Sequence, residues 1–256
     1  MRSKIEESTY IHISDCSNRP QLSLPGCFTM FMDMATVHGE ELGMGMKALA
    51  EKGIIWVASK TRILIHRWPA MLENVTVATW PEAPGRLRCN RFYSMHSGDA
   101  MIAEGKTEWI MFEPATGKMV KTEGNYPENI EHCPDVVCDL PFSRIDDHFE
   151  DCTQLCSYTV SSRDIDISQH MNNVHYVRAL MGALTTKQIE ALAITGAEAI
   201  FRIQCYEGEV LSLRMRDWEN GIDLAAVKDD GKTAMILRLT CEGKGFPHVE
   251  AVTEGD

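Results

Sequence analysis

The sequence has neither a long apolar run nor an excess of positive charge. No segment approaches the roughly 18 uncharged apolar residues that a membrane-spanning helix needs. The start, Met1 to Glu7, lacks the apolar core of a secretion signal, so we expect a cytoplasmic protein. Acidic residues outnumber basic ones by 37 to 25, giving a formal charge of -12 that would repel a phosphate backbone. We therefore expect no membrane span and no nucleic-acid partner.

The motifs of several large enzyme classes are also missing. The chain contains no G-x-S-x-G, no Walker glycine loop, no G-x-G-x-x-G and no H-E-x-x-H, which disfavours a serine hydrolase, an NTPase, a dinucleotide enzyme and a zinc peptidase. Nine cysteines without an export signal favour reduced thiols over disulfides. The cysteines and histidines nearest to a zinc pattern do not have the usual C-x₂-C spacing: Cys133, Cys138, Cys152, Cys156, His132 and His148. We expect neither a metal nor any other cofactor.

What the chain does contain is the composition of a globular protein, with 44% hydrophobic residues over 256 positions, enough for one large domain or two small ones. Apolar residues at helical spacing predict a long helix over Leu24–Leu42, with Ser23 as N-cap and Gly43 as the stop. Strands are predicted to follow at Ile54–Trp68, Val75–Trp80, Leu87–Met95 and Ala100–Phe112. The first half is thus one helix with several antiparallel strands.

The second half repeats this order after a proline-rich stretch. We predict a strand over Leu155–Ser161, a helix from Asn172 to about Leu192, and strands over Ala199–Cys205, Val210–Trp218, Leu224–Lys228 and Thr233–Cys241. A single long helix needs a curved sheet to cover it, and each half supplies both. The predicted organisation is α+β, with an N-terminal unit over residues 1–130, a linker over 131–150 and a C-terminal unit over 151–256.

The densest polar segment lies directly before the second predicted helix. Asp166, Ser168 and His170 alternate with other residues, so in an extended stretch their side chains would lie on one side. A helix that begins at Asn172 or Asn173 would also aim free N–H groups at that place, which can stabilise negative charge on a carbonyl oxygen. The alternative is purely structural, with Asp166 and the asparagines capping the helix and His170 bonding backbone.

This segment resembles a known family. Residues 163–177, RDIDISQHMNNVHYV, are similar to the D-x-D-x-N-x-H-x-N-N-x-x-Y signature of the acyl-ACP thioesterases of plants and bacteria. The first half resembles the N-terminal half of that family in order and spacing, through Ser23-Leu-Pro, Met34 to His38, Trp56-Val57, Arg67-Trp68-Pro69 and Val75 to Pro81. The resemblance implies a tandem hot-dog fold, in which each half wraps an antiparallel sheet around a long helix. It also implies hydrolysis of fatty acyl-acyl carrier protein, with the acyl pocket in the first half and catalysis in the second.

By this resemblance the catalytic positions of the family fall on Asp166, Ser168, His170, Gln204 and Cys205. Two of them depart from the pattern, because Ser168 stands where the family has Asn and Gln204 stands where it has Glu. Glu is a general base for water and Gln is not, although an amide still orients a water or a carbonyl by hydrogen bonds. Cys205 is either a nucleophile with a stabilised thiolate or a small apolar residue in a strand.

An acidic protein needs some basic surface to bind an acidic carrier. The candidates are Lys60 and Arg62 on one strand, and the cluster Arg86, Arg88 and Arg91; each set is equally consistent with a solvated strand face. Met30 and Met34, four apart on the first helix, either line the acyl pocket or fill the core.

Three functions remain open at this point. The first is an acyl-ACP thioesterase in which water attacks the thioester. The second is an acyl-ACP or acyl-CoA binding protein without turnover, motivated by Gln204 and Ser168. The third is a hydratase or dehydratase that uses the same fold. A monomer and a homodimer are both consistent with two fused hot-dog units.

Overall fold

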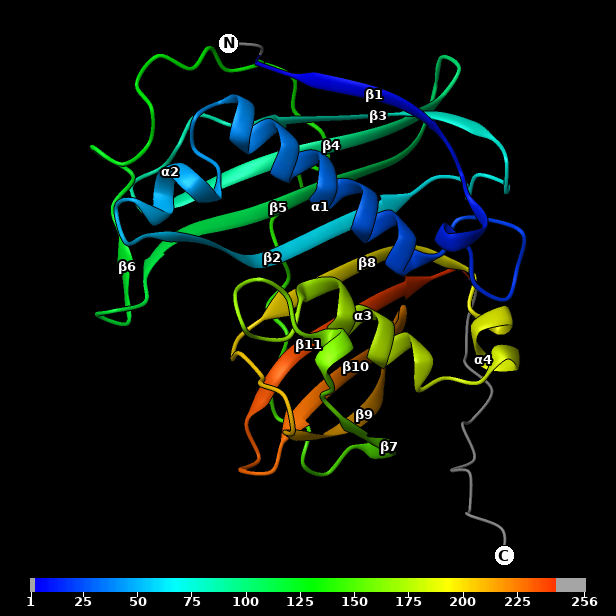
Figure 1. The fold of residues 1–256 in the computed structure, drawn as a ribbon. Helices are drawn as coiled ribbons and strands as arrows, with labels where there is room; N and C mark the ends of the chain where they lie inside the picture. The colour runs from blue at the N-terminus through cyan, green and yellow to red at the C-terminus, as the bar shows by residue number, and fades with distance from the viewer. Residues whose placement is uncertain (1–2, 243–256) are drawn as a thin grey trace, which may run out of the picture. The chain divides into compact units, whose positions relative to one another are not determined.

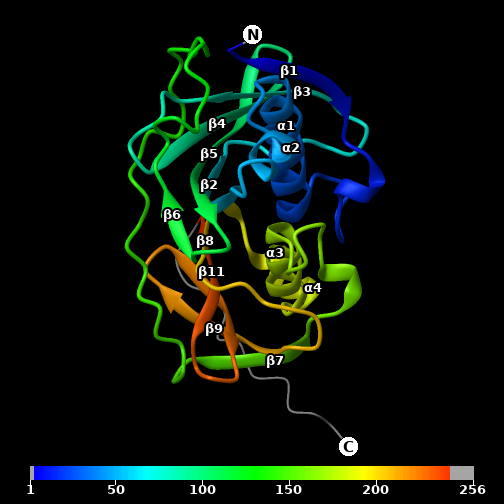
Figure 2. The same ribbon diagram turned by 60° about the vertical axis from the view of Figure 1, so that its left-hand side comes forward.

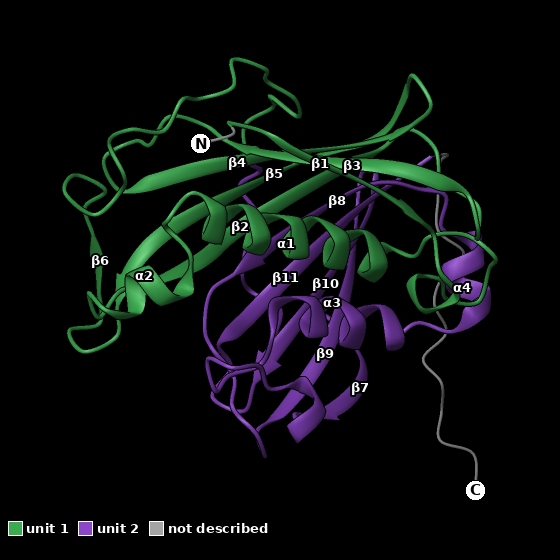
Figure 3. Cartoon of the chain, turned by 45° about the horizontal axis from the view of Figure 1, so that its top comes forward, with its two compact units in different colours: residues 1–141 green, residues 142–256 purple. Residues whose placement is uncertain are grey.

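The computed structural model describes residues 3–242, and the chain divides into two compact units, Met1–Pro141 and Phe142–Asp256. Figure 3 shows the two units in different colours. Their boundary falls inside the segment 131–150 that was predicted as a linker. No helix within residues 3–242 is long and apolar enough to span a membrane.

Unit 1 is an antiparallel sheet with a long helix on one face (Figures 1 and 2). The strands pair in the order β1, β3, β4, β5, β2, and β6 pairs with β5. The bounds of the elements are β1 Ile5–Tyr10, η1 Ile13–Asp15, α1 Leu24–Glu41, α2 Met46–Ala50, β2 Ile55–Ile65, β3 Asn74–Pro81, β4 Arg88–Ser97, β5 Ala100–Glu113 and β6 Lys118–Val120. The predicted long helix and four strands are confirmed, whereas β1 and β6 were not predicted.

Local chemistry sets the limits of α1 as expected. The Ser23 Oγ accepts a hydrogen bond of 3.1 Å from the Gly26 N–H, which caps the first turn. After the last turn, Gly43 adopts φ 68°, a left-handed conformation that favours glycine and ends the helix. The buried face of α1 includes Phe28, Phe31 and His38, which turn toward the sheet.

Unit 2 has the same plan with a shorter helix. Its strands pair antiparallel in the order β8, β11, β10, β9, β7. The elements are β7 Thr153–Thr159, η2 Ser162–Asp164, α3 Asn173–Gly182, α4 Thr186–Ala191, β8 Ile194–Phe201, β9 Val210–Trp218, β10 Gly221–Lys228 and β11 Thr233–Cys241. Each unit is thus a hot-dog domain of the α+β class, which confirms the predicted fold class.

Two predictions in unit 2 are wrong. The helix predicted from Asn172 to about Leu192 is two helices, because Thr185 starts α4 with a capping box in which it exchanges hydrogen bonds with Gln188. The strand predicted over Ala199–Cys205 ends at Phe201, so Gln204 and Cys205 lie in the loop that follows β8.

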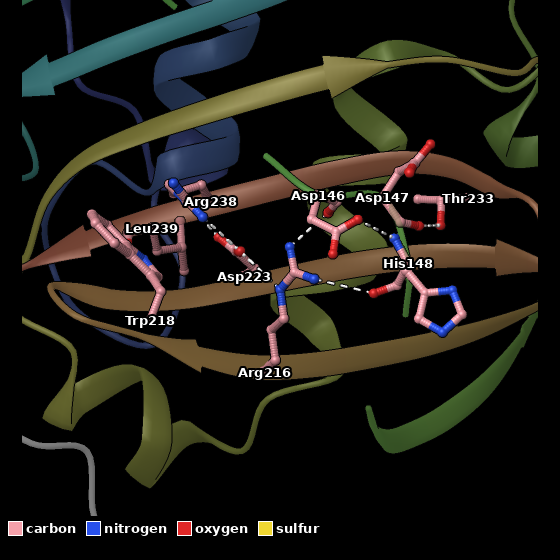
Figure 4. Close-up of polar contacts among 9 residues, drawn as sticks. All are labelled: Asp146, Asp147, His148, Arg216, Trp218, Asp223, Thr233, Arg238 and Leu239. Carbon is pink, nitrogen blue, oxygen red and sulfur yellow. Dashed lines mark hydrogen bonds and ion pairs between the residues drawn. The ribbon is translucent and has the colours of Figure 1, made fainter. Parts of the chain in front are cut away.

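A buried ion cluster holds residues 146–149 against the sheet of unit 2 (Figure 4). The Asp223 side chain on β10 is fully buried and accepts hydrogen bonds from Arg238 of β11 at 2.6 and 2.8 Å and from Arg216 of β9 at 3.1 Å. Arg216 also donates to the backbone carbonyls of Asp146 and His148. The two arginines therefore neutralise one carboxylate, and Arg216 in addition fixes the covering segment.

Candidate active site

The residues of the second-half signature form a tight turn rather than the extended stretch that was predicted. The Asp166 N–H donates to the His170 carbonyl at 3.1 Å, and the Gln169 N–H donates to the Asp166 carbonyl at 2.9 Å. Gln169 takes the left-handed conformation, with φ 65°, which closes the turn. The turn, and not strand alternation, brings the polar side chains of this segment together.

Within the turn, Asp166, Ser168 and His170 form a hydrogen-bonded row. The Ser168 hydroxyl contacts the Asp166 carboxylate on one side and lies 2.8 Å from Nε2 of His170 on the other. The carboxylate also accepts bonds from the Ser168 N–H at 2.8 Å and from the Asn172 side-chain amide at 3.1 Å. Both oxygens of the Asp166 carboxylate thus accept hydrogen bonds from within the turn or from the N-cap of α3.

The N-terminus of α3 lies at the end of this row. Asn172 is the N-cap, and its Oδ1 accepts a bond of 2.8 Å from the Val174 N–H. The N–H of Asn173, the first helical residue, has no hydrogen-bond acceptor among residues 3–242. The capping role expected for Asn172 and an available N–H group next to it are therefore both present.

Gln204 and Cys205 lie beside the turn because the Met171 N–H donates to the Cys205 carbonyl at 2.8 Å. The Gln204 Oε1 accepts a bond of 3.2 Å from the Tyr206 hydroxyl. The Cys205 side chain is fully buried, and burial raises the pKa of its thiol. A neutral, enclosed thiol favours the packing role for Cys205 over the nucleophilic one.

The loop that carries Gln204 is anchored by an ion pair that was not predicted. Lys228 of β10 contacts both carboxylate oxygens of Glu209, at 2.8 and 2.9 Å, and also donates to the Gln204 carbonyl at 3.3 Å. The lysine thereby links two ends of one loop. In the sequence, the only sign of this ion pair is the acidic turn before β9, because Lys228 is distant along the chain.

Asp164 forms a second unpredicted network behind the turn. Its buried carboxylate accepts bonds from the Tyr158 hydroxyl at 2.8 Å and from the Ser161 N–H at 2.8 Å, and His175 Nδ1 lies 3.2 Å away. Burial alone would raise the pKa of Asp164, but these hydrogen bonds outweigh burial and lower the pKa to about 2. The network ties β7 and η2 to α3, which fixes the start of the turn.

In unit 1 the structure separates the predicted basic residues by exposure. Arg86 and Arg88 are exposed, and Arg88 pairs with Glu108 at 2.5 Å. Lys60 is half-buried on β2. The prediction that Arg62 and Arg91 bind a carrier is wrong: Arg62 is 8% exposed and donates to the Leu140 carbonyl, and Arg91 is 5% exposed on the helix side of β4.

The two methionines predicted to line the acyl pocket differ in burial. On α1, Met34 is buried and Met30 is half-buried.

All nine cysteines are free. Within the described residues no three His, Cys, Asp or Glu side chains are grouped so that they would hold a metal ion.

Two family models match the chain in succession. The model of the acyl-ACP thioesterase N-terminal domain matches residues 3–130, and that of the acyl-ACP thioesterase C-terminal domain matches residues 149–239. Among curated proteins, an acyl-[acyl-carrier-protein] hydrolase of Cuphea viscosissima is 23% identical over 203 residues, covering 74% of this chain and 49% of the relative. An oleoyl-acyl carrier protein thioesterase of Coriandrum sativum is 24% identical, covering 78% and 54%. The chain spans about half the length of these relatives.

Solved structures with similar folds cover nearly the whole chain. An acyl-ACP thioesterase from Bacteroides thetaiotaomicron has a TM-score of 0.84 at 19% identity, with 94% of this chain and 98% of that one covered. The 12:0-ACP thioesterase from Umbellularia californica has a TM-score of 0.78 at 14% identity, with 95% and 99% covered. At these identities the likeness shows a shared fold.

Proposed function

Because the chain belongs to the acyl-ACP thioesterase family, we propose that it hydrolyses the thioester joining a fatty acyl group to acyl carrier protein. The observation that carries this proposal is the row of Asp166, Ser168 and His170 beside the N–H group of Asn173. The row supplies groups for proton transfer, and the helix terminus supplies a donor for a developing oxyanion.

In the proposed reaction, water attacks the carbonyl carbon of the thioester. The new C–O bond forms as the carbonyl oxygen becomes negative, and the C–S bond then breaks when this oxyanion collapses. One proton of the water moves to His170 and then to the departing sulfur, so the products are a fatty acid and the carrier thiol. Imidazole suits this transfer because its protonated and neutral forms exchange near neutral pH.

The other residues of the site position these groups. Asp166 holds Ser168, and Ser168 in turn contacts His170. The N–H of Asn173 stabilises the oxyanion, and Gln204 orients the water or the carbonyl through its side-chain amide. Cys205 packs beneath this loop as a neutral thiol.

Unit 1 contributes the surfaces that bind substrate. In our proposal Met30 and Met34 line the acyl pocket, and Arg86 and Arg88 form the basic surface for the acidic carrier. Arg86 is the stronger candidate, since the Arg88 guanidinium is already paired with Glu108.

A panel of acyl-ACPs of different chain length tests the function by release of the carrier thiol. We expect steady release by the unaltered protein and a loss of about 10²–10⁴-fold in kcat for His170→Ala. His148→Ala is the matched control, because His148 is an exposed histidine of the same unit. Equal rates for His170→Ala and the unaltered protein would refute the assignment of His170.

The competing function is binding without turnover, and a specific observation favours it. Gln204 occupies the family's Glu position by resemblance and is no base, and the neighbouring thiol is buried. Tight binding of acyl-ACP without thiol release would establish this alternative. Double-bond chemistry without thiol release would instead indicate a hydratase or dehydratase.

A further inference from the structure

The helix side of β4 carries a buried arginine that the proposed reaction does not use. Arg91 and Tyr93 alternate along β4 and both side chains turn toward α1. The ring of Tyr93 stacks on Phe31 with centroids 4.8 Å apart, and Nη1 of Arg91 lies 3.0 Å from Nδ1 of His38. Both residues therefore belong to the interior of unit 1, between its sheet and its long helix.

The charge of Arg91 has no counter-ion in this interior. Its hydrogen-bond partners are His38 and the Thr79 hydroxyl, at 3.0 and 3.2 Å. Because arginine only donates, Nδ1 of His38 is the acceptor in that contact and carries no proton. No Asp or Glu among residues 3–242 forms an ion pair with Arg91, although this residue is only 5% exposed. Burial lowers the pKa of Arg91, as expected for an uncompensated cation.

Three further polar atoms near Arg91 are buried and make no hydrogen bond of good geometry, although the Tyr93 hydroxyl lies close to the side chains of Thr107 and Trp109. They are the hydroxyls of Tyr93 and Tyr126 and the indole nitrogen of Trp109. The positive charge of Arg91 lowers the pKa of both tyrosines, against the larger raising effect of burial, so both hydroxyls lie within its field. Trp109 lies on the same face of the sheet, because it pairs with Cys89, two residues from Arg91. We call Arg91, Tyr93, Trp109 and Tyr126 the Arg91 cluster.

The chemistry of the Arg91 cluster defines what would complete it. Arginine and the indole N–H only donate hydrogen bonds, and each tyrosine hydroxyl is able to donate one. A group that accepts several bonds and carries negative charge would satisfy these donors and neutralise Arg91. A carboxylate does both, and its pairing with arginine is among the strongest hydrogen-bonded contacts in proteins.

The surroundings of Tyr126 and Trp109 within the cluster are apolar. Tyr126 packs with Leu42, Leu49, Cys89 and Met111 in one hydrophobic cluster of unit 1. Tyr126 and Leu49 also line a surface pocket of about 280 Å³ in the same unit, whose rim carries Lys52, Asn125 and Glu128. An aliphatic chain fits such walls, and ligand sites commonly combine apolar walls with a few polar groups.

We propose that the interior of unit 1 binds the carboxylate of an aliphatic ligand, held by Arg91 and by the tyrosine hydroxyls of the Arg91 cluster. The choice of an aliphatic chain rests on the proposed function, whereas the choice of a carboxylate rests on the cluster alone. Two sources supply this chemistry: the far-end carboxyl group of a dicarboxylic acyl substrate, or the carboxyl group of the fatty acid product.

Binding to the full chain tests the proposal without any catalytic step. Dodecanedioate, dodecanoate and dodecanol are titrated by calorimetry, with tryptophan fluorescence as a second signal. We expect at least one of the acids to bind roughly 30-fold or more tightly than the alcohol, because only an acid pairs with the buried guanidinium. Equal affinity for the alcohol and both acids would overturn the proposal.

Conservative variants separate a ligand site from a structural or water-filled cluster. Tyr93→Phe and Tyr126→Phe each remove one hydroxyl, and we expect each to weaken acid binding roughly 2- to 10-fold. Tyr10→Phe is the matched control, since Tyr10 is an exposed tyrosine of β1. Arg91→Met should abolish the preference for an acid over the alcohol. If both Tyr→Phe variants keep full acid affinity and only raise Tm, the cluster holds water and the proposal fails.

Hydrolysis assays then distinguish the two sources of the carboxylate. Faster hydrolysis of the ω-carboxyacyl-ACP than of its unsubstituted counterpart identifies the substrate's far end. Inhibition by dodecanoate without such a preference identifies the product. If the protein binds the acids but hydrolyses neither acyl-ACP, the carboxylate site is supported and the proposed hydrolytic function is refuted.

Discussion

Ser168 places its hydroxyl oxygen 2.8 Å from Nε2 of His170 while it contacts the Asp166 carboxylate. The hydroxyl has one proton, so it donates either to Asp166 or to His170, and the ionised carboxylate only accepts. When it donates to Asp166, it accepts from protonated Nε2; when it donates to His170, that nitrogen is unprotonated and the histidine is a base. Ser168 thereby couples the protonation of His170 to its carboxylate neighbour.

This coupling predicts different outcomes for two substitutions of Ser168. Ser168→Ala removes the link, and we expect kcat for acyl-ACP to fall by about 100-fold, the lower end of the range for lost proton-transfer assistance. Ser168→Asn should retain activity, because an amide has a separate donor for Asp166 and a separate acceptor for His170. Ser157→Ala, at an exposed serine of β7, is the control. A fully active Ser168→Ala enzyme would show that Ser168 has no part in the reaction.

Gln204→Glu should raise the rate of hydrolysis. The substitution restores a carboxylate at the family's Glu position, and such a base contributes about 10²–10⁴-fold where it acts on water. The gain requires the ionised form, so it should appear above about pH 5 and vanish below the ordinary Glu range near pH 4.3. Gln154→Glu adds the same charge at an exposed position of β7 and should change nothing. No gain at any pH would mean that another residue activates water in this protein.

Charge reversal at Arg86 tests the proposed carrier surface. Arg86→Glu should raise KM for acyl-ACP several-fold at low salt with little effect on kcat, because exposed charges at an interface act mainly on association. The difference should shrink as ionic strength rises. Lys187→Glu on α4 changes the net charge equally at another exposed position, so it controls for general repulsion by the acidic chain. Equal KM values for both variants would exclude Arg86 from carrier binding.

What the sequence revealed depended on how local each feature is. The limits of α1 were predictable because Ser23 and Gly43 act on adjacent residues. The inward position of Arg91 was missed, because the density of basic residues in its segment concealed the alternation along β4. The contacts of Asp223 were beyond prediction, since its arginine partners lie on two other strands. Predictions thus failed where a contact depended on strand register.

In the candidate active site, too, local features were predictable and contacts between distant segments were not, but the backbone conformation of the signature was predicted incorrectly. Asp166, Ser168 and His170 were expected together from alternation, and a turn closed by Gln169 brings them together instead. The family resemblance identified these residues without regard to backbone conformation. Lys228 could not be found in this way, because its contact with Glu209 joins a strand to a distant loop.

Asp164 predicts how stability depends on pH. Its pKa is about 2 in the folded protein against an ordinary value of 3.8, so the ionised form stabilises the fold. This contribution, about 2 kcal/mol, is complete above the unfolded value and is lost as the pH falls from about 4 to 2. Asp164→Asn should lower the free energy of unfolding at pH 7 by a similar amount. It should also make the free energy of unfolding depend less on pH between about pH 4 and 2. The control is Asp229→Asn, at an exposed position. It should leave the free energy of urea unfolding unchanged both at pH 7 and below about pH 4.

The buried Asp223 should be the most sensitive carboxylate of unit 2. Asp223→Ala leaves Arg216 and Arg238 facing each other across a vacated strand position, with side-chain exposures of only 22% and 18%. Removal of one partner from a buried ion pair typically costs about 3–5 kcal/mol. Here Arg216 loses its counter-ion, whereas Arg238 still faces Glu198, its register partner on β8, whose charge raises the pKa of Arg238. Arg216 also holds the carbonyls of Asp146 and His148, so the covering segment should open as well. Urea unfolding measures the first effect and amide hydrogen exchange over residues 146–149 the second. Asp217→Ala, at an exposed aspartate of β9, provides the control. Equal free energies of unfolding for the two variants would mean that water or other groups neutralise the arginines.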